Sequence, residues 1–365
     1  MRDYEEKRFK SADGVHKCYS VIMRPDGEPK GILQISHGMC EYIDRYLDFM
    51  SYIADRGYVV CGNDHLGHGK TVFDKEELGY FGGGENGWKY ALADLHRMTK
   101  LVKSEYPDLP LILLGHSMGS FLARAYAVKY GSECRGFIFM GTADAFEADF
   151  RTLVSKTVYK MDKLSGAAGM ISPKLKEIGN KVSFKLDGKL EGKDKYVGRA
   201  AIALLIKQAN AIGKVKGDKH RSKTLTKIGF GKYNDRIKKV KTGYEWLSRD
   251  EAMVKKYARD PYCNFLFTVN GWQNVAAMMW YVSDERWYES FPRKTPTLLM
   301  SGLEDPVGSY GKGVRTVFRR LLDKGCAVKM RLYEGDRHEL INEINRDKVY
   351  EDIAEQLDSV IAIEE

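Results

Sequence analysis

The sequence contains no long apolar run. No stretch approaches the ~18 consecutive apolar residues that a membrane-spanning helix needs. Residues 1–8 also have no apolar segment of the kind found in a secretory signal, so we expect neither a signal peptide nor a membrane-spanning helix. The expected location is the cytoplasm.

Closely spaced pairs of cysteines are absent from the sequence as well. No two of the six cysteines are spaced as C-x-x-C, which speaks against zinc and iron–sulfur sites. We expect reduced thiols and no cofactor. The cysteines are Cys18, Cys40, Cys61, Cys134, Cys263 and Cys326.

Acidic residues are scarce only in the middle of the chain. Residues 151–260 hold 28 Lys/Arg and 11 Asp/Glu, a net charge of +17. The rest holds 31 Lys/Arg and 39 Asp/Glu, a net charge of −8. Such a basic segment could meet an anionic membrane surface or anionic substrates, or it could simply be a solvated face. No aromatic-interleaved recognition motif supports nucleic-acid binding.

The 365 residues fit two domains, or one α/β domain with an insertion, at roughly 150 residues per domain. Short apolar runs predict strands, and most of them alternate with segments of helical spacing, which indicates a mostly parallel sheet with helices on both faces. The predicted strands are 17–24, 31–36, 58–62, 111–114, 136–140, 296–302 and 327–333. The predicted helices are 46–54, 90–106, 121–130, 314–322 and 349–363.

The alternation breaks between residues 142 and 291, where Lys-rich amphipathic segments predominate. We therefore expect a first core segment at 1–141, a mainly helical insertion at 142–291 and a second core segment at 292–365. The later part of the insertion is rich in large apolar side chains, which would line a substrate pocket or fill an ordinary core. They are Met253, Tyr257, Tyr262, Phe265, Phe267, Trp272, Met278, Met279, Trp280 and Tyr281.

One motif carries the strongest chemical signal. Residues 115–119 read Gly-His-Ser-Met-Gly, directly after a predicted strand and directly before a predicted helix. This is the setting of a nucleophile elbow, where flanking glycines permit a strained turn that exposes the hydroxyl. Ser117 is the candidate nucleophile.

A serine hydroxyl needs a base within hydrogen-bond reach, and the base needs an acid that sets its tautomer. His338 follows the predicted strand 327–333, and Asp305 follows the predicted strand 296–302. Glu304 and Asp336 are alternative acids, and His220 is an alternative base within a basic run.

The tetrahedral intermediate also needs two N–H donors where negative charge develops. The N–H of Met118, directly after the nucleophile, is one candidate. The N–H of Met39, in the loop after strand 31–36, is the other, unless His37-Gly38 is merely a tight turn.

Five motifs occur in order and together resemble the α/β-hydrolase superfamily, most closely its monoglyceride lipase/lysophospholipase group, which shares its pattern with serine aminopeptidase-type hydrolases. They are His37-Gly38-Met39-Cys40-Glu41 with Arg45-Tyr46, the segment Asn63 to Thr71, Gly115 to Ser120, Gly302 to Val307, and Gly335 to Glu339. The match covers about residues 4–140 and 296–365.

The resemblance implies an α/β-hydrolase fold with Ser117 as nucleophile, His338 as base, Asp305 as acid, and Met39 and Met118 as oxyanion donors. It implies a serine hydrolase that cleaves carboxylic esters through an acyl-enzyme and takes a small acyl ester as substrate. The alternatives are a peptidase acting at a free amino terminus, or an inert scaffold for interactions.

The chain departs from the family in its middle, where the Lys-rich insertion is longer than the usual cap. Pocket residues of the family therefore cannot be transferred to this region. His65 and His68 could suggest a metal site, although their segment is usually a structural turn in the family. The run Gly82-Gly83-Gly84 is not a phosphate loop, because no Gly-Lys-Ser/Thr follows.

Overall fold

The computed structural model describes residues 2–144 and 195–362, and the predicted insertion residues 145–194 lie outside them. Eight strands form one sheet in the spatial order β1-β2-β4-β3-β5-β6-β7-β8. The strands are β1 (Glu5–Lys10), β2 (Lys17–Met23), β3 (Gly31–Ser36), β4 (Tyr58–Asn63), β5 (Leu111–His116), β6 (Gly136–Met140), β7 (Thr297–Gly302) and β8 (Val328–Tyr333). β2 runs opposite to the other seven strands, so its pairings with β1 and β4 are antiparallel and the remaining five pairings are parallel. The predicted mostly parallel sheet is confirmed.

The sequence pattern finds β2 to β8 to within two residues at each end, but it misses β1. The sequence of β1 is Glu-Glu-Lys-Arg-Phe-Lys, and its side chains alternate between half-buried and exposed. An edge strand of this kind carries little apolar signal, because its pairing with β2 depends on backbone hydrogen bonds rather than on burial.

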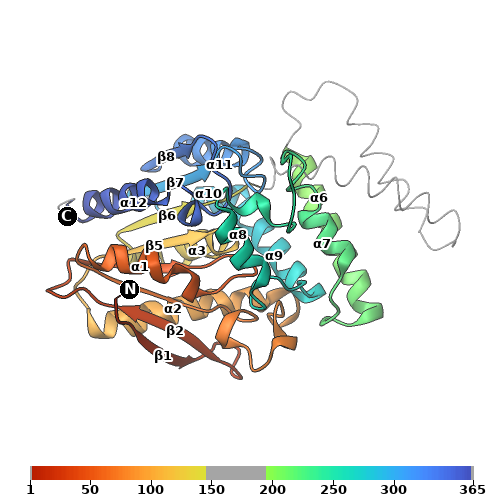
Figure 1. Cartoon of the computed structure of the whole chain (residues 1–365), viewed down its shortest axis with the longest axis horizontal. Helices are drawn as coiled ribbons and strands as arrows, with labels where there is room; N and C mark the ends of the chain where they lie inside the picture. The colour runs from red at the N-terminus through yellow and green to blue at the C-terminus, as the bar shows by residue number, and fades with distance from the viewer. Residues whose placement is uncertain (1, 145–194, 363–365) are drawn as a thin grey trace, which may run out of the picture.

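Helices cover both faces of the sheet (Figure 1). The core helices are α1 (Leu47–Ala54), α2 (Gly87–Glu105), α3 (Met118–Tyr130), α11 (Lys312–Asp323) and α12 (Arg346–Ile361). Helices α1 and α12 share one hydrophobic core, and α2, α3 and α11 share the other. Alternate strand residues point to opposite faces, so Phe137 and Phe139 of β6 enter the second core while Ile138 and Met140 enter the first.

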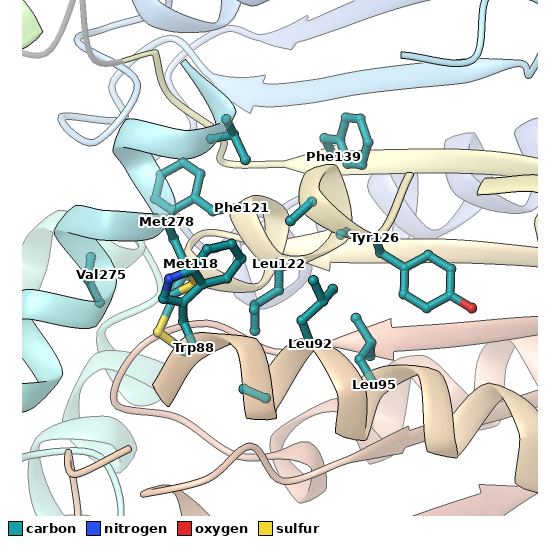
Figure 2. Packing of buried hydrophobic residues seen from close by; sticks show 14 of the residues in the cluster. Trp88, Leu92, Leu95, Met118, Phe121, Leu122, Tyr126, Phe139, Val275 and Met278 are labelled. Carbon is teal, nitrogen blue, oxygen red and sulfur yellow. The ribbon is translucent and has the colours of Figure 1, made fainter. Parts of the chain in front are cut away.

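The core shared by α2, α3 and α11 is closely packed around α3. Figure 2 shows Leu92 of α2 beside Leu122 of α3, with Val275 and Met278 of α9 entering from the side of the insertion. The side chain of Leu122 is completely buried. Helix α3 is therefore fixed by α2, by β5 and by α9, which positions the residue directly before its first turn.

The described part of the insertion forms a helical cap between β6 and β7. Its helices are α6 (Lys195–Lys216), α7 (Lys223–Phe230), α8 (Glu251–Arg259), α9 (Val269–Val282) and α10 (Glu285–Ser290), with a short 3-10 turn η6 (Glu245–Leu247). They gather at one end of the sheet, away from the C-terminus (Figure 1). The predicted boundaries after residues 141 and 291 fall between β6 and β7 and stay predictions.

No helix in the described ranges combines the length and the apolar character required to cross a membrane. The six cysteines are all buried and unpaired.

Replacing Leu122 by Ala should lower the free energy of unfolding by about 2–5 kcal/mol, because the completely buried side chain leaves a cavity between α2 and α3. Urea denaturation at pH 7 measures this change. Leu322→Ala on α11 is the matched control, since Leu322 is 52% exposed and should cost far less. Equal losses in the two variants would contradict this account of the core.

Candidate active site

Ser117 lies in a strained turn between β5 and α3. Its φ of 52° and ψ of −120° are outside the regions that non-glycine residues usually adopt. The turn brings α3 so close to β3 that a Cβ on Gly119 would collide with the carbonyl oxygens of Ser36 and His37. Glycine at position 119 is therefore a steric requirement of the elbow that presents the Ser117 hydroxyl.

The predicted base and acid are paired. His338 Nδ1 lies 3.0 Å from Asp305 Oδ1, and both side chains are buried. The N–H of Val307 donates to the same carboxylate oxygen at 2.8 Å and fixes its orientation. An imidazole whose Nδ1 donates to a carboxylate leaves Nε2 as the nitrogen that can accept a proton.

The alternative acids and base take other positions. Glu304 is exposed, while Asp336 pairs with Arg249 and accepts a hydrogen bond from Asn345. His220 lines an open surface groove of the cap rather than the cavity beside Ser117. Of the weighed candidates, Asp305 is the one that contacts His338.

Ser117 and His338 line the same cavity, which has a volume of about 330 Å³. Its floor comes from segments that follow the carboxyl ends of β3, β5, β7 and β8, the edge at which ligands bind in open α/β sheets. Within the described ranges, no hydrogen bond joins the Ser117 hydroxyl to His338. The structure thus brings the three side chains to one site and joins two of them directly.

Both predicted oxyanion donors lie on this cavity. Met118 is the first residue of α3, so its N–H has no partner within the helix. Met39 lies in the loop after β3, whose backbone reaches a φ of 56° at Cys40. Among the described residues neither N–H is used in a hydrogen bond. A helix N-terminus beside a free loop N–H favours negative charge at this point.

A buried ionic network contacts the loop after β3 that carries the predicted donor Met39, which we term the oxyanion loop. Glu41 accepts hydrogen bonds from the Gly38 N–H at 2.5 Å, from His116 Nδ1 at 2.8 Å and from Arg45 at 2.9 Å. Arg45 also holds both carboxylate oxygens of Glu339 at 2.7 Å. These five residues all belong to the motifs that carry the family resemblance, but their types alone do not show that they meet.

The network shifts the pKa values of its members. Burial alone would raise the pKa of Glu41, but His116 and Arg45 lower it by more, and the net direction is down. Burial alone would lower the pKa of His116, but the Glu41 carboxylate raises it above its usual value. Both shifts favour the charged forms of Glu41 and His116.

Three other buried histidines form a separate group beside the oxyanion loop. The ring centroid of His37 lies 4.2 Å from that of His65 and 5.3 Å from that of His68. Burial lowers the pKa of His37 to about 4 and that of His68 to about 3. The segments that the structure describes contain no group of three or more His, Cys, Asp or Glu side chains arranged to hold a metal ion.

Cap side chains give the cavity a mainly apolar wall. Of the ten large apolar residues singled out in the sequence, five line it: Tyr257, Phe265, Phe267, Trp272 and Met279. The other five do not. Met278 packs in the core, and Trp280 and Tyr281 line a different surface groove. The sequence could not separate these groups, because every one of them is large and apolar.

The eight-stranded sheet, the strained serine turn and the His338–Asp305 pair define an α/β-hydrolase. Residues 27–345 match the family described as serine aminopeptidase, S33 (Hydrolase_4). The chain belongs to that family, and the predicted fold and family group are confirmed.

Curated relatives match part of the chain. The monoacylglycerol lipase of Mycolicibacterium smegmatis is 29% identical over 138 residues, which is 38% of this chain and 46% of that protein. The monoglyceride lipase homolog of Monkeypox virus is 35% identical over 105 residues, 29% of this chain and 36% of that protein. The aligned segments thus span less than half of either relative.

Solved structures match nearly the whole chain. A carboxyl esterase of Bacillus coagulans, solved in complex with glycerol, has a TM-score of 0.78 and 28% identity, and the match covers 99% of this chain and 100% of that one. A lipase in an open form has a TM-score of 0.74 and 25% identity, with coverage of 99% and 100%. Monoglyceride lipase of Saccharomyces cerevisiae, at 18% identity, a TM-score of 0.64 and coverage of 100% and 96%, shares the fold.

Replacing His68 by Phe should flatten the dependence of stability on pH between pH 7 and pH 5. The folded chain keeps His68 neutral while the unfolded chain binds a proton below its usual pKa of about 6.5, so stability present at pH 7 is lost as the pH falls. The contribution over this range is roughly 2 kcal/mol. The aromatic rings of Phe81, Phe265 and Phe267 around His68 can accommodate a phenyl ring.

Chemical denaturation of both proteins at several pH values measures the difference. The comparison must be with the wild type, because burial raises the pKa of Asp64 to about 7 and so shifts stability in the opposite direction. Parallel pH curves for the two proteins would show that His68 does not titrate in this way.

Proposed function

We propose that the protein is a serine hydrolase that cleaves carboxylic esters through an acyl-enzyme on Ser117. The observation that carries this proposal is the buried His338–Asp305 pair beside Ser117, on a cavity with a mainly apolar wall. A carboxylate-oriented imidazole makes a serine hydroxyl nucleophilic by accepting its proton, and the strained turn exposes that hydroxyl to the substrate.

In this mechanism His338 Nε2 takes the proton of the Ser117 hydroxyl as its oxygen attacks the ester carbonyl. The N–H groups of Met39 and Met118 then hold the oxyanion of the tetrahedral intermediate. The imidazolium of His338 gives its proton to the leaving alcohol, and the acyl group stays on Ser117. A water molecule activated by His338 releases the acid and restores the serine.

The cavity favours an ester with an apolar acyl chain. Its cap wall consists of side chains such as Phe267, Trp272 and Met279, which can bury hydrocarbon but offer no charge. Two of the similar proteins, a monoacylglycerol lipase and a carboxyl esterase, act on esters of this class. We therefore place the substrate among small carboxylic esters such as monoacylglycerols and lysophospholipids.

The charge around the cavity speaks against a peptidase that acts at a free amino terminus. Such an enzyme needs an unpaired carboxylate to bind the substrate ammonium. Among the described residues, the carboxylates that line the cavity are Glu41 and Glu339, and both are already bound by Arg45. Comparing the turnover of aminoacyl arylamides with that of aryl esters separates the two activities.

The basic cap supports a further proposal, that it meets anionic membrane surfaces. Residues 207–241 hold twelve Lys/Arg and two Asp/Glu. Two valines in this stretch are strongly exposed between lysines, Val215 at 83% and Val240 at 48%. Exposed lysines add electrostatic attraction to anionic lipid, and exposed apolar side chains can enter the headgroup region.

Ser117→Ala should abolish hydrolysis of short p-nitrophenyl esters, because the variant has no nucleophile, while its thermal stability stays close to that of the wild type. A fluorophosphonate probe should label the wild type and leave the variant unlabelled. Ser20→Ala is the control, since Ser20 is completely buried on β2, away from the cavity. An active Ser117→Ala variant, or a wild type that is neither labelled nor active and is thus an inert scaffold, would contradict the proposal.

Sedimentation with vesicles tests the membrane proposal. The wild type should bind phosphatidylglycerol vesicles at low salt and should lose that binding near 0.5 M salt, because salt screens the charges. It should not bind phosphatidylcholine vesicles, whose surface carries no net charge. Lys238→Glu with Lys239→Glu should weaken the binding several-fold. Lys100→Glu with Lys329→Glu, two exposed changes outside the cap, should not. Salt-independent binding, or equal losses in both pairs, would argue against the basic cap as the contact.

A further inference from the structure

The residue before the nucleophile is a buried histidine whose two ring nitrogens both point at acceptors. His116 Nδ1 lies 2.8 Å from the Glu41 carboxylate, and Nε2 lies 3.4 Å from the carbonyl oxygen of His338. A neutral imidazole has only one N–H, so it could donate to one of these oxygens and would turn a lone pair toward the other. The positively charged imidazolium is the form that satisfies both.

The surrounding charges fit a cation at this position. Glu41 and Glu339 supply two negative charges, and Arg45 supplies one positive charge. With His116 charged, the buried group is neutral overall, whereas a neutral His116 would leave one negative charge uncompensated away from water. Further titratable groups beside this pair are the rings of His37 and His338 and the hydroxyl of Tyr46, which donates to the same Glu41 oxygen at 3.0 Å. Burial lowers the pKa of His37 to about 4 and raises the pKa of Tyr46 well above its usual value, so neither group adds a charge.

The contacts of this ion pair reach two parts of the catalytic site. The Glu41 oxygen that binds His116 also accepts the N–H of Gly38, the residue before the oxyanion donor Met39. The other nitrogen of His116 meets the backbone of His338 itself, and the two rings lie 4.8 Å apart. One side chain thus connects the oxyanion loop, the nucleophile elbow and the loop that carries the catalytic histidine.

We propose that His116 is a positively charged positioning residue that, together with Glu41, fixes the oxyanion loop and the His338 loop relative to Ser117. The inference rests on the proposed function and extends it, because it assigns a role to a charge that acts through its contacts with the Gly38 side of the oxyanion loop and with the backbone of His338. Oxyanion donors act only when they lie within a few tenths of an ångström of their working position, so the effect appears in the transition state rather than in substrate binding.

The charge on His116 can be observed directly. In spectra of the wild type labelled with ¹⁵N-histidine, both ring nitrogens of His116 should carry a proton at pH 7, and loss of the signals in His116→Gln assigns them. A neutral tautomer, with one protonated and one bare nitrogen, would overturn the proposal. The measurement reports on the folded wild type, so it holds whatever the stability of the variants.

Kinetics on a p-nitrophenyl ester test the positioning role. His116→Gln and Glu41→Gln should each lower kcat roughly 10- to 100-fold and leave KM within about twofold. The double variant should be no slower than the slower single variant, because the two side chains act as one pair. A boronic acid that mimics the tetrahedral intermediate should lose affinity in proportion to kcat.

The control removes a buried carboxylate that forms ion pairs elsewhere in the fold. Asp352 of α12 binds Arg331 and Lys348 and lies outside the cavity, so Asp352→Asn should lower stability and leave kcat unchanged. All assays are run at a temperature where melting curves show each variant folded.

The outcomes separate two kinds of failure. A wild type without ester turnover or fluorophosphonate labelling overturns the proposed function and this inference with it. An active wild type whose His116 and Glu41 variants keep kcat and boronic-acid affinity, or show additive losses, overturns this inference alone.

Discussion

The site depends on one close approach between backbones. Helix α3 begins directly after Ser117, and at Gly119 it touches the carbonyl oxygens at the end of β3. A side chain at position 119 would push the helix away, and the strained φ of Ser117 would relax with it. The same contact places the N-terminus of α3 beside the loop after β3, so it positions both Ser117 and the loop that carries Met39.

The remaining parts of the site reach this point through the sheet. Parallel strands end at one edge, so the loops after β3, β5, β7 and β8 meet although they come from separate parts of the chain. The acid loop after β7 and the histidine loop after β8 are neighbours because those strands pair in register. Buried hydrogen bonds then fix the geometry: Val307 holds Asp305, and Asp305 holds His338.

The cap contacts the same loops through a backbone hydrogen bond and through aromatic and ionic contacts. The N–H of Glu339 donates to the Leu247 carbonyl of η6 at 2.7 Å, and the Trp246 ring lies 5.2 Å from the ring of His338. Arg45 bridges Glu41 below and Glu339 beside this turn, and its guanidinium stacks on Tyr257 of α8. The cap, His338 and the loop after β3 therefore share one set of buried contacts, so a change in any of them should alter the position of the others.

Local patterns along the chain predicted the strand–helix alternation and the glycine-flanked serine, and they offered His338 and Asp305 among several candidates, because apolar spacing and the residues that follow a strand are visible without the fold. These patterns did not predict β1, because the mostly charged side chains of this edge strand lack the apolar run by which the other strands were recognised. Nor did they show which cap aromatics face the cavity, or that Glu41, Arg45, His116 and Glu339 form one buried group. Those features depend on which distant side chains share a desolvated space, and only the tertiary packing decides that.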